Sequence, residues 1–434
     1  MDAGGFQHEV SEVLARLIRF DTVNPPGDEL ALQLWLRDYL TEAGLECELV
    51  GAVDGRPNLI ARLTGDQPGP TLAYLSHVDT VLADAGDWSR DPWSGEIHGG
   101  FLWGRGAIDM KDQTAAEVVA VAHLARSGWR PARGELKLMA LVDEEVGGLL
   151  GAKWLTQERP DLARADWLVN EGGGAVMPYG DRRLYGVCCA EKGTYRFRVR
   201  TRGVAGHASV PGLGDNALLK LGPVLERLGA QQAGFDLTAE PRALLKALGE
   251  DPSDPAEAIA RVRAVEPRLA AMVEPTMRVT AVPTRISASE KINVIPAHAE
   301  LQVDCRVPPG MTGEAAMARI RALLPDDSLD VSFIEEVPGN RSAIDTPLMD
   351  AIAAWMGEAD PAAEVVPTVL PAFTDSRWFR AAFPDCAAYG FFPMRHTTLY
   401  DSWPLMHGAD ERIDVRDLGF ATEFFADLPR RLLG

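Results

Sequence analysis

Short apolar runs alternate with helical patterns through the first part of the chain, and this alternation limits the possible folds more than any other feature. The apolar runs cover residues 58–63, 71–75, 136–142 and 167–169, and a helical pattern covers residues 114–126. Continuous apolar strands joined by helices are typical of a sheet that helices cover on both faces. The sequence therefore predicts an α/β domain with a mixed, mostly parallel sheet covered by helices.

The pattern changes near Lys192, which indicates a second, inserted domain. Alternating strands and helices follow there, at residues 195–199, from 216, around Ile292 and Leu301, at 314–324 and at 331–334. This βαββαβ order is typical of a small α+β domain. Because the helix and strand alternation resumes near residue 351, we expect one domain made of residues 1–191 and 340–434, with residues 192–339 inserted. Residues 231–276 read as extra helices without an assigned function.

Charge and composition exclude several classes of partner. The formal net charge is −20, with both signs spread along the chain, which argues against nucleic acid or an anionic membrane surface. The sequence shows no signal-peptide pattern at its start and no stretch near the roughly 18 apolar residues of a membrane span, so we expect a cytoplasmic protein. The five cysteines have no CxxC spacing, which indicates neither a disulfide framework nor a cysteine zinc site.

Acidic and histidine residues directly follow three of the predicted strands. His77 and Asp79 follow the second apolar run, Glu144 and Glu145 follow the third, and Glu171 follows the fourth. Because ligands in open α/β sheets bind at the carboxyl ends of the strands, we expect these side chains to converge on one crevice.

Two further segments carry residues of the same chemistry. Asp109 ends a glycine-punctuated loop at the start of a helix, and His407 precedes the last helix. Each segment alone has an ordinary interpretation, such as a surface pair or a helix cap. Together they offer imidazole and carboxylate, the ligands that borderline cations such as zinc prefer. Two divalent cations against Asp109, Glu145 and Glu171 leave a net charge of +1, which a hydroxide would neutralise.

The ordered motifs SHVDTV, GRGAIDMK, DEEVGG, NEGG, GVAGHAS and MHGADERI resemble the M20 family of metallopeptidases and deacylases. That family includes carboxypeptidase G-type enzymes, aminoacylase-1, acetylornithine deacetylase and succinyl-diaminopimelate desuccinylase. The resemblance covers essentially the whole chain. It implies a zinc-peptidase-like catalytic domain with an inserted lid and dimerisation domain, a homodimer formed through that lid, and two Zn²⁺ ions, with Co²⁺ or Mn²⁺ as alternatives.

The resemblance also implies roles for the five candidate ligands. His77 and Glu171 would bind one metal, Glu145 and His407 would bind the other, and Asp109 would bridge both. The peptide bond after Asp109 is expected to be cis.

Three other residues match positions with catalytic roles in the family. Asp79 would orient the imidazole of His77, and Glu144 would act as the general base. His207, in the GVAGHAS motif, would donate to the oxyanion in the active site of the neighbouring subunit. The alternative interpretation is that His207 is a structural histidine at a strand end, with its hydrogen bonds satisfied locally and no catalytic role.

The resemblance implies a substrate with a free α-carboxylate, held by Asn293, Arg306 and Arg377. Guanidinium groups bind carboxylates bidentately, although either arginine could instead form a structural ion pair. Glu171, where aminopeptidase-type members tend to carry Asp, favours N-acyl amino acids or carboxypeptidase-like cleavage of short peptides. The alternatives are a biosynthetic deacylase of the acetylornithine or succinyl-diaminopimelate type, a dipeptidase, or a non-catalytic relative that only binds metal and amino acids. A non-catalytic relative could lose Glu144 without structural cost, and this chain retains it.

Overall fold

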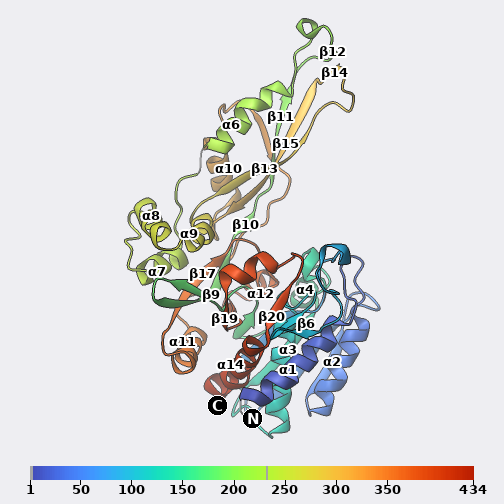
Figure 1. Cartoon of the computed structure of the whole chain (residues 1–434), viewed down its shortest axis with the longest axis vertical. Coiled ribbons are helices and arrows are strands. Elements are labelled where there is room, and N and C mark those ends of the chain that lie inside the picture. The colour runs from blue at the N-terminus through green and yellow to red at the C-terminus, as the bar shows by residue number, and fades with distance from the viewer. Residues whose placement is uncertain (1–2, 231–232) are drawn as a thin grey trace. The chain divides into compact units, whose positions relative to one another are not determined.

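The computed structural model describes residues 3–230 and 233–434 and divides into two compact units (Figure 1). The first unit comprises residues 1–189, 342–368 and 374–434, and the second comprises residues 190–341 and 369–373. Residues 192–339, which the sequence analysis reads as an insertion, lie within the second unit.

Within the described residues, the first unit is built on a ten-stranded sheet. Nine of its strands follow one another in the spatial order β1 (Glu46–Val50), β2 (Asn58–Thr64), β6 (Glu135–Leu141), β3 (Thr71–His77), β7 (Trp167–Asn170), β18 (Ala387–Gly390), β9 (Arg182–Glu191), β8 (Ala175–Tyr179) and β19 (Met394–Thr398). The remaining strand, β17 (Ala363–Leu370), pairs with β9.

The sheet is mixed, as predicted, and its centre is parallel. Strand β3 runs parallel to β6 and β7, and β7 runs parallel to β18. Strands β1 and β2 on one side, and β9 and β8 on the other, pair antiparallel. The parallel centre brings the carboxyl ends of β6, β3 and β7 to one edge.

Helices cover both faces of this sheet because successive side chains of each central strand point to opposite faces. Leu72 and Tyr74 pack into one hydrophobic cluster, and Ala73 and Leu75 pack into another. The first cluster holds helices α1 (Ala3–Ile18), α2 (Leu30–Glu42), α3 (Lys111–Arg126), α11 (Pro347–Ala359) and α14 (Val415–Leu433), and the second holds α4 (Ala152–Glu158), α5 (Pro160–Ala163) and α12 (Ser376–Ala382). Figure 1 shows α1 and α14, near the two chain ends, side by side against α3.

Shorter elements connect these layers. A small sheet joins β20 (Arg412–Asp414), β5 (Phe101–Trp103) and β4 (Ile97–His98). The other short helices are α13 (Leu399–Ser402) and the 3₁₀ turns η1 (Ala85–Asp87), η2 (Glu144–Val146) and η6 (Trp403–Leu405). All five cysteines lie within the described residues and are free thiols.

The second unit is an α+β structure around an antiparallel sheet, as the change of pattern near Lys192 predicts. Its strands are β10 (Gly193–Thr194), β15 (His298–Val307), β11 (Phe197–Arg202), β16 (Asp330–Phe333) and β13 (Thr280–Ser287), which pairs with β15. The short strands β12 (Gly206–His207) and β14 (Val294–Ile295) form a separate pair. Two helices, α6 (Gly222–Ala230) and α10 (Gly313–Ala322), contribute to its core.

One strand prediction in this unit is wrong in position. The strand expected around Ile292 is only the two-residue β14, and Ile292 itself lies outside it with a fully exposed side chain. The alternating apolar residues there do not face a core, which is the assumption behind a strand prediction from alternation.

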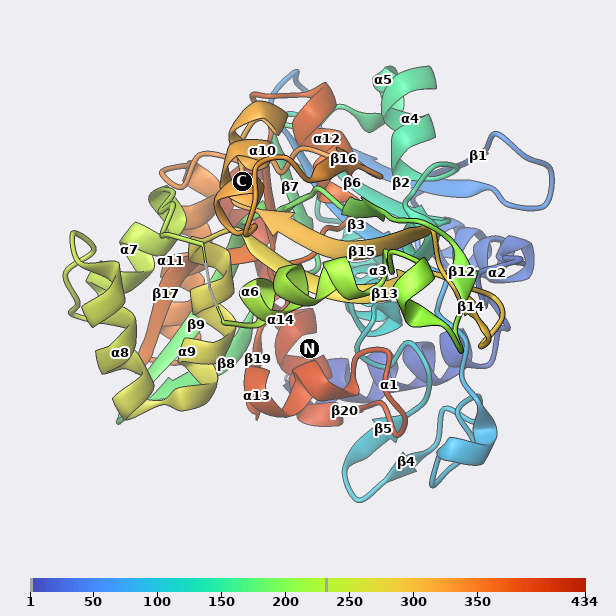
Figure 2. The same cartoon turned by 90° about the horizontal axis from the view of Figure 1, so that it is seen from above.

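The predicted extra helices of residues 231–276 are present, although residues 231–232 lie outside the described residues. They are α7 (Ala239–Ala247), α8 (Pro255–Val265) and α9 (Pro267–Val273), and the 3₁₀ turn η5 (Glu274–Met277) follows α9. Two other 3₁₀ turns of this unit, η3 (Pro211–Leu213) and η4 (Leu219–Leu221), precede α6. Figure 2 shows α7, α8 and α9 at one end of this unit and β12 and β14 at the other.

A buried lysine anchors these helices to the start of the unit. The Lys192 ammonium donates to the carbonyl oxygens of Pro275 at 2.5 Å and Arg278 at 2.8 Å. Burial lowers the pKa of Lys192 to about 7. Lys192, two residues after the start of the second unit at Ala190, therefore also fixes the end of the helical segment.

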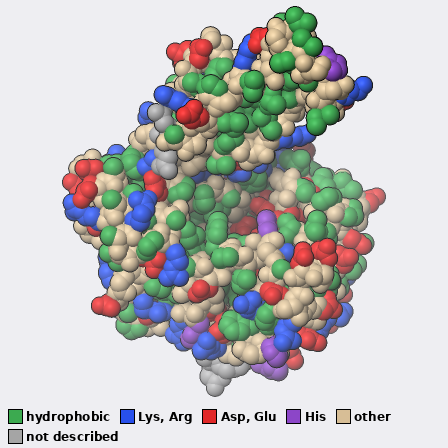
Figure 3. Space-filling model, turned by 45° about the horizontal axis from the view of Figure 1, so that its top comes forward, with side chains coloured by type: hydrophobic (Ala, Val, Ile, Leu, Met, Phe, Trp, Pro, Cys, Tyr) green, Lys and Arg blue, Asp and Glu red, His purple; other side chains and the backbone are tan. Residues whose placement is uncertain are grey.

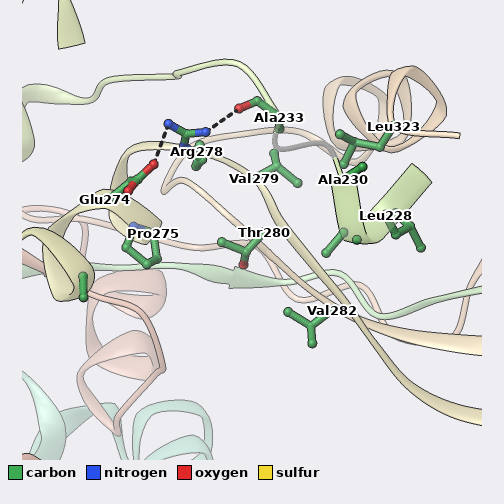
Figure 4. A pocket seen from close by; sticks show the side chains of 13 residues that line it. Leu228, Ala230, Ala233, Glu274, Pro275, Arg278, Val279, Thr280, Val282 and Leu323 are labelled. Carbon is green, nitrogen blue, oxygen red and sulfur yellow. Dashed lines mark hydrogen bonds and ion pairs between the residues drawn. The ribbon is translucent and has the colours of Figure 1, made fainter. Parts of the chain in front are cut away.

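A cavity of about 530 Å³ lies beside this anchor, lined by residues of α6, η5 and β13 (Figure 4). The guanidinium of Arg278 lies 2.8 Å from a carboxylate oxygen of Glu274 and 3.2 Å from the carbonyl oxygen of Ala233. The charged groups of the cavity pair with one another, and we assign it no ligand.

Two surface properties bear on the excluded partners. Across residues 3–230 and 233–434, no helix is long and apolar enough to cross a membrane. On the face that Figure 3 shows, acidic and basic side chains are interspersed. A single-sign surface of the kind that binds polyanions is not present on this face.

Candidate metal centre

Three adjacent strands of the first unit end in the predicted functional residues. His77 is the last residue of β3, Glu144 and Glu145 lie in η2 directly after β6, and Glu171 directly follows β7. Because β6, β3 and β7 are neighbours and parallel, their carboxyl ends present these side chains at one edge of the sheet. Asp109 reaches the same edge from the residue before the N-cap of α3.

Asp109 lies between two histidines. Its Oδ1 is 3.2 Å from His77 Nε2, and its Oδ2 is 3.1 Å from His407 Nε2. His77 Nε2 is also 3.7 Å from Glu171 Oε1, and His407 Nε2 is 3.2 Å from Glu145 Oε2. The structure thus groups the five candidate ligands as two histidine and glutamate pairs that share one aspartate.

The donor set fits divalent cations. Ligand atoms of His77, Asp109 and Glu145 all lie within 4.8 Å of one another, and so do those of His77, Glu144 and Glu171. Imidazole nitrogens and carboxylate oxygens are the donors that zinc and similar cations bind. Since Glu144 belongs to the second group, distances alone do not separate a ligand from a general base at this position.

The titration behaviour of the cluster reflects closely packed charges. Burial and neighbouring carboxylates raise the pKa of Glu144, Glu145 and Glu171. The hydrogen bonds that His407 makes with Asp109 and Glu145 raise the pKa of His407 to about 10. Buried carboxylates that repel one another gain stability from a bound cation, which is consistent with a metal centre.

Asp79 lies behind His77 and holds several parts of the site. Its side chain is fully buried, with Oδ1 3.6 Å from His77 Nδ1. It accepts hydrogen bonds from Asn24 Nδ2 at 2.9 Å and from the backbone N–H groups of Glu144 and Glu145 at 3.2 Å each. Asp79 therefore contacts both a candidate ligand and the turn that carries the candidate base. The peptide bond between Asp109 and Met110 is cis, which confirms that expectation.

An ion-pair network that the sequence analysis missed supports the same turn. Arg56 Nη2 lies 2.6 Å from Glu29 Oε1, and Arg56 Nη1 lies 3.1 Å from Asp143 Oδ1. Asp143 adopts a left-handed backbone with φ of 77° and also accepts a hydrogen bond from Asn24 Nδ2 at 3.2 Å. Because the partners are far apart in sequence, no local motif predicts these ion pairs.

Asp375 is a second residue that the sequence analysis passed over. It is buried, burial raises its pKa to about 7, and its Oδ2 has no hydrogen-bond partner within the described residues. Repulsion from the Asp375 carboxylate is among the causes that raise the pKa of Glu144 and Glu171. Within the TDSR segment, the sequence predicted a role only for Arg377, two residues after Asp375.

The substrate residues predicted from the resemblance divide between the two units. Arg377 belongs to the first unit and donates to the carbonyl oxygen of Gly147 at 2.9 Å, next to η2. Arg306 belongs to the second unit and pairs with Asp304 at 2.8 Å while donating to Thr194 Oγ1 at 3.0 Å. The charge of Arg306 is thus balanced within its own unit.

His207 and Asn293 lie together in the second unit. His207 pairs with Val294 in the β12 and β14 ladder, and the carbonyl oxygen of Asn293 accepts from the Ala208 N–H at 3.0 Å. Both side chains are exposed. His207 Nδ1 lies 2.6 Å from the Ser209 hydroxyl oxygen and 3.2 Å from the Ser209 backbone nitrogen, so Ser209 contacts this ring nitrogen through both groups.

The absence of a side chain at Gly390 makes room for the backbone of Glu171. A Cβ atom at position 390 would overlap the carbonyl oxygen of Glu171. We expect Gly390→Ala to lower the free energy of unfolding by about 1–3 kcal/mol, as overpacking does, and to weaken metal binding, both measurable by urea unfolding and metal titration. Gly357→Ala is the control, because a Cβ atom there meets no described atom within 4 Å. Unchanged stability of Gly390→Ala would contradict this packing argument.

The chain is similar in sequence to known hydrolases. A family model described as Peptidase family M20/M25/M40 matches residues 73–431. A succinyl-diaminopimelate desuccinylase of Cereibacter sphaeroides is 27% identical over 417 residues, covering 93% of each chain. Aminoacylase-1 of Sus scrofa is 26% identical over 418 residues, covering 94% of this chain and 91% of the other.

Solved structures share the fold. Human carnosine dipeptidase 1 superposes with a TM-score of 0.70 at 17% identity, covering 99% of this chain and 97% of the other. An M20 family metallo-carboxypeptidase of Sulfolobus solfataricus gives a TM-score of 0.69 at 18% identity, covering 98% and 99%. At these identities the likeness shows the fold alone, and it confirms the predicted fold class.

Proposed function

The chain belongs to peptidase family M20/M25/M40 and is a hydrolase of amide or peptide bonds, and on this premise we propose that it cleaves small substrates with a free α-carboxylate by means of two Zn²⁺ ions. The substrates would be N-acyl amino acids or short peptides cut at the C-terminal peptide bond. The observation that carries the proposal is Asp109, whose two oxygens face His77 and His407 at 3.2 and 3.1 Å.

The donor set divides naturally between two cations. His77 and Glu171 would hold one, His407 and Glu145 would hold the other, and Asp109 would bind both. When bound, the cations would polarise the amide carbonyl and lower the pKa of a water molecule. Co²⁺ or Mn²⁺ would suit the same nitrogen and oxygen donors.

Glu144 would move the proton in this reaction. Burial and the neighbouring Glu171 raise the pKa of Glu144, which would suit a carboxyl group that accepts a proton from water and delivers it to the leaving nitrogen. Asp79 would keep the imidazole of His77 in the ligating orientation, since a carboxylate behind a ligating histidine fixes its ring and tautomer.

Arg377 is the better supported of the two arginines for binding the substrate carboxylate. It lies in the first unit beside η2, where it contacts Gly147, whereas Arg306 already shares its charge with Asp304. Asn293 would add an amide donor from the second unit.

A more specific deacylase is the second candidate function. Relatives named succinyl-diaminopimelate desuccinylase, one of them 27% identical over 93% of both chains, favour a substrate with a second carboxylate on the acyl group. The two candidates share the metal centre and differ in the acyl group and in the amine that leaves.

A hydrolysis panel tests both candidates. On metal-reconstituted protein we expect cleavage of N-acetyl, N-chloroacetyl or longer N-acyl amino acids, or of X-Glu and X-Ala dipeptides, and little cleavage of the matching α-carboxamides. N-succinyl-diaminopimelate and N-acetylornithine in the same panel distinguish the biosynthetic candidates. Removing metal with a chelator should abolish activity, and Zn²⁺, Co²⁺ or Mn²⁺ should restore it. Equal cleavage of free and amidated substrates would contradict recognition of the α-carboxylate.

We also propose that the protein forms a homodimer through the second unit. Figure 3 shows hydrophobic side chains exposed over this unit. Exposed apolar residues surround the β12 and β14 pair, namely Val204, Val210, Leu213, Ile292 and Val294. Contiguous exposed apolar surface is typical of a protein interface, and it lies beside His207, which would serve the partner's active site.

A further inference from the structure

Glu411 is a fully buried carboxylate that binds one short loop at four points. Its Oε1 accepts from the backbone N–H groups of Ile108 at 2.6 Å and Asp109 at 3.1 Å. Its Oε2 accepts from Arg105 Nη1 at 2.6 Å and the Gly106 N–H at 3.1 Å. A single side chain thus fixes the segment that ends at Asp109, the residue shared by both histidines.

Arg105 completes the connection on the other side. While one nitrogen of its guanidinium pairs with Glu411, another donates to the Gly408 carbonyl oxygen at 2.9 Å. The guanidinium also lies 5.2 Å from the ring of Trp88, and the side chain is buried. Glu411 and Arg105 therefore tie the Asp109 loop to the residue directly after His407.

The geometry of Asp109 and His407 depends on this connection. The Asp109 carboxylate faces His77 and His407 at the same time, while His407 stands on a left-handed backbone with φ of 57° and is half exposed. A metal site tolerates errors of only a few tenths of an ångström in its ligands. Two loops about 300 residues apart in sequence must therefore be held at a fixed separation.

We propose that Glu411 is a positioning residue that sets the separation of Asp109 and His407 and thereby the affinity of the site for its second cation. It acts through hydrogen bonds to the loop backbone and through Arg105, and it touches neither substrate nor metal. This inference rests on the proposed function, because it requires that Asp109 and His407 bind metal.

Zn²⁺ titration against a chromophoric chelator tests the inference without any measurement of activity. Glu411→Gln keeps the shape of the side chain but loses the charge that pairs with Arg105 and one acceptor oxygen. We expect the variant to bind Zn²⁺ about 10–100-fold more weakly at one site, as removal of groups that orient ligands does. With Co²⁺ as the probe, the visible absorption spectrum should change because the ligand geometry changes.

Glu240→Gln is the matched control. Glu240 is likewise fully buried and pairs with an arginine, Arg341, at 3.2 Å in the second unit. Its replacement should lower the unfolding temperature and leave Zn²⁺ affinity unchanged. Glu411→Asp is a second variant for the case in which Glu411→Gln does not fold, since it keeps the charge and shortens the reach to the loop, and it should also weaken Zn²⁺ binding.

The possible results distinguish failure of the Glu411 inference from failure of the proposed function. If wild-type protein binds two Zn²⁺ and a folded Glu411 variant binds them with the same affinity and the same Co²⁺ spectrum, Glu411 has only a structural role and the inference is overturned. If wild-type protein does not bind two Zn²⁺, the proposed function fails and this inference fails with it.

Discussion

Glu144→Gln is expected to lower kcat by at least 10²-fold while two metal ions remain bound. Glutamine keeps the size and hydrogen-bonding capacity of the side chain but cannot accept the proton of the attacking water, and loss of a general base costs about 10²–10⁴-fold. Glu145 Oε2 lies 3.2 Å from His407 Nε2, and Glu145 Oε1 accepts from the Val81 N–H at 3.1 Å. These contacts favour Glu145 as the ligand, and we propose Glu144 as the residue that transfers the proton.

Metal content and kcat, measured on the same preparation, check this result. Glu145→Gln is the matched control, because it changes the neighbouring carboxylate by the same single group and should lose metal. If Glu144→Gln instead loses a metal and retains turnover per loaded site, the roles of Glu144 and Glu145 are reversed.

His207→Ala is expected to lower kcat by about 10²–10³-fold, the usual cost of losing one oxyanion donor, with a smaller change in KM. A donor that meets the carbonyl oxygen only as negative charge develops stabilises the transition state more than the bound substrate. Ser209 contacts His207 Nδ1 through its hydroxyl and its backbone nitrogen, so the proposed donor atom is Nε2.

Subunit mixing determines which active site His207 serves. When inactive His207→Ala and inactive Glu144→Gln proteins exchange subunits, each heterodimer should contain one site with both Glu144 and a His207 from the partner, and activity should return. A mixture of two His207→Ala preparations is the control and should stay inactive. No recovery, although heterodimers demonstrably form, would show that His207 acts within its own subunit or not at all.

The arrangement of the candidate ligands could be predicted from the sequence because local rules and the sheet fix it. His77, Glu145 and Glu171 directly follow apolar runs, and neighbouring parallel strands end at the same edge. Asp109 and His407 come from loops whose path no periodicity determines, and the family motifs supplied their specific roles. Their roles as ligands stay predictions until metal binding is measured.

The supporting residues could not be predicted, and the reason is their distance along the chain. Glu411 binds donors at residues 105–109, and Arg56 joins Glu29 to Asp143. Each contact forms only when the fold is complete, and an isolated acidic residue in a sequence is most often on the surface. The expected strand at Ile292 failed for a related reason, since alternation shows which side chains are apolar but not what they face.

The path of the chain between the two units has an evolutionary consequence. The Ser342 N–H donates to the Cys189 carbonyl oxygen at 2.9 Å, so the main segment of the second unit, residues 190–341, leaves and rejoins the first unit at neighbouring residues. An insertion with adjacent ends places little constraint on its host. All five candidate metal ligands lie outside it, while His207, Asn293 and Arg306 lie inside it. Under the proposed function, mutations in the insertion would alter which substrates are accepted while the metal chemistry stays under separate selection, and one hydrolytic centre could diversify into many specificities.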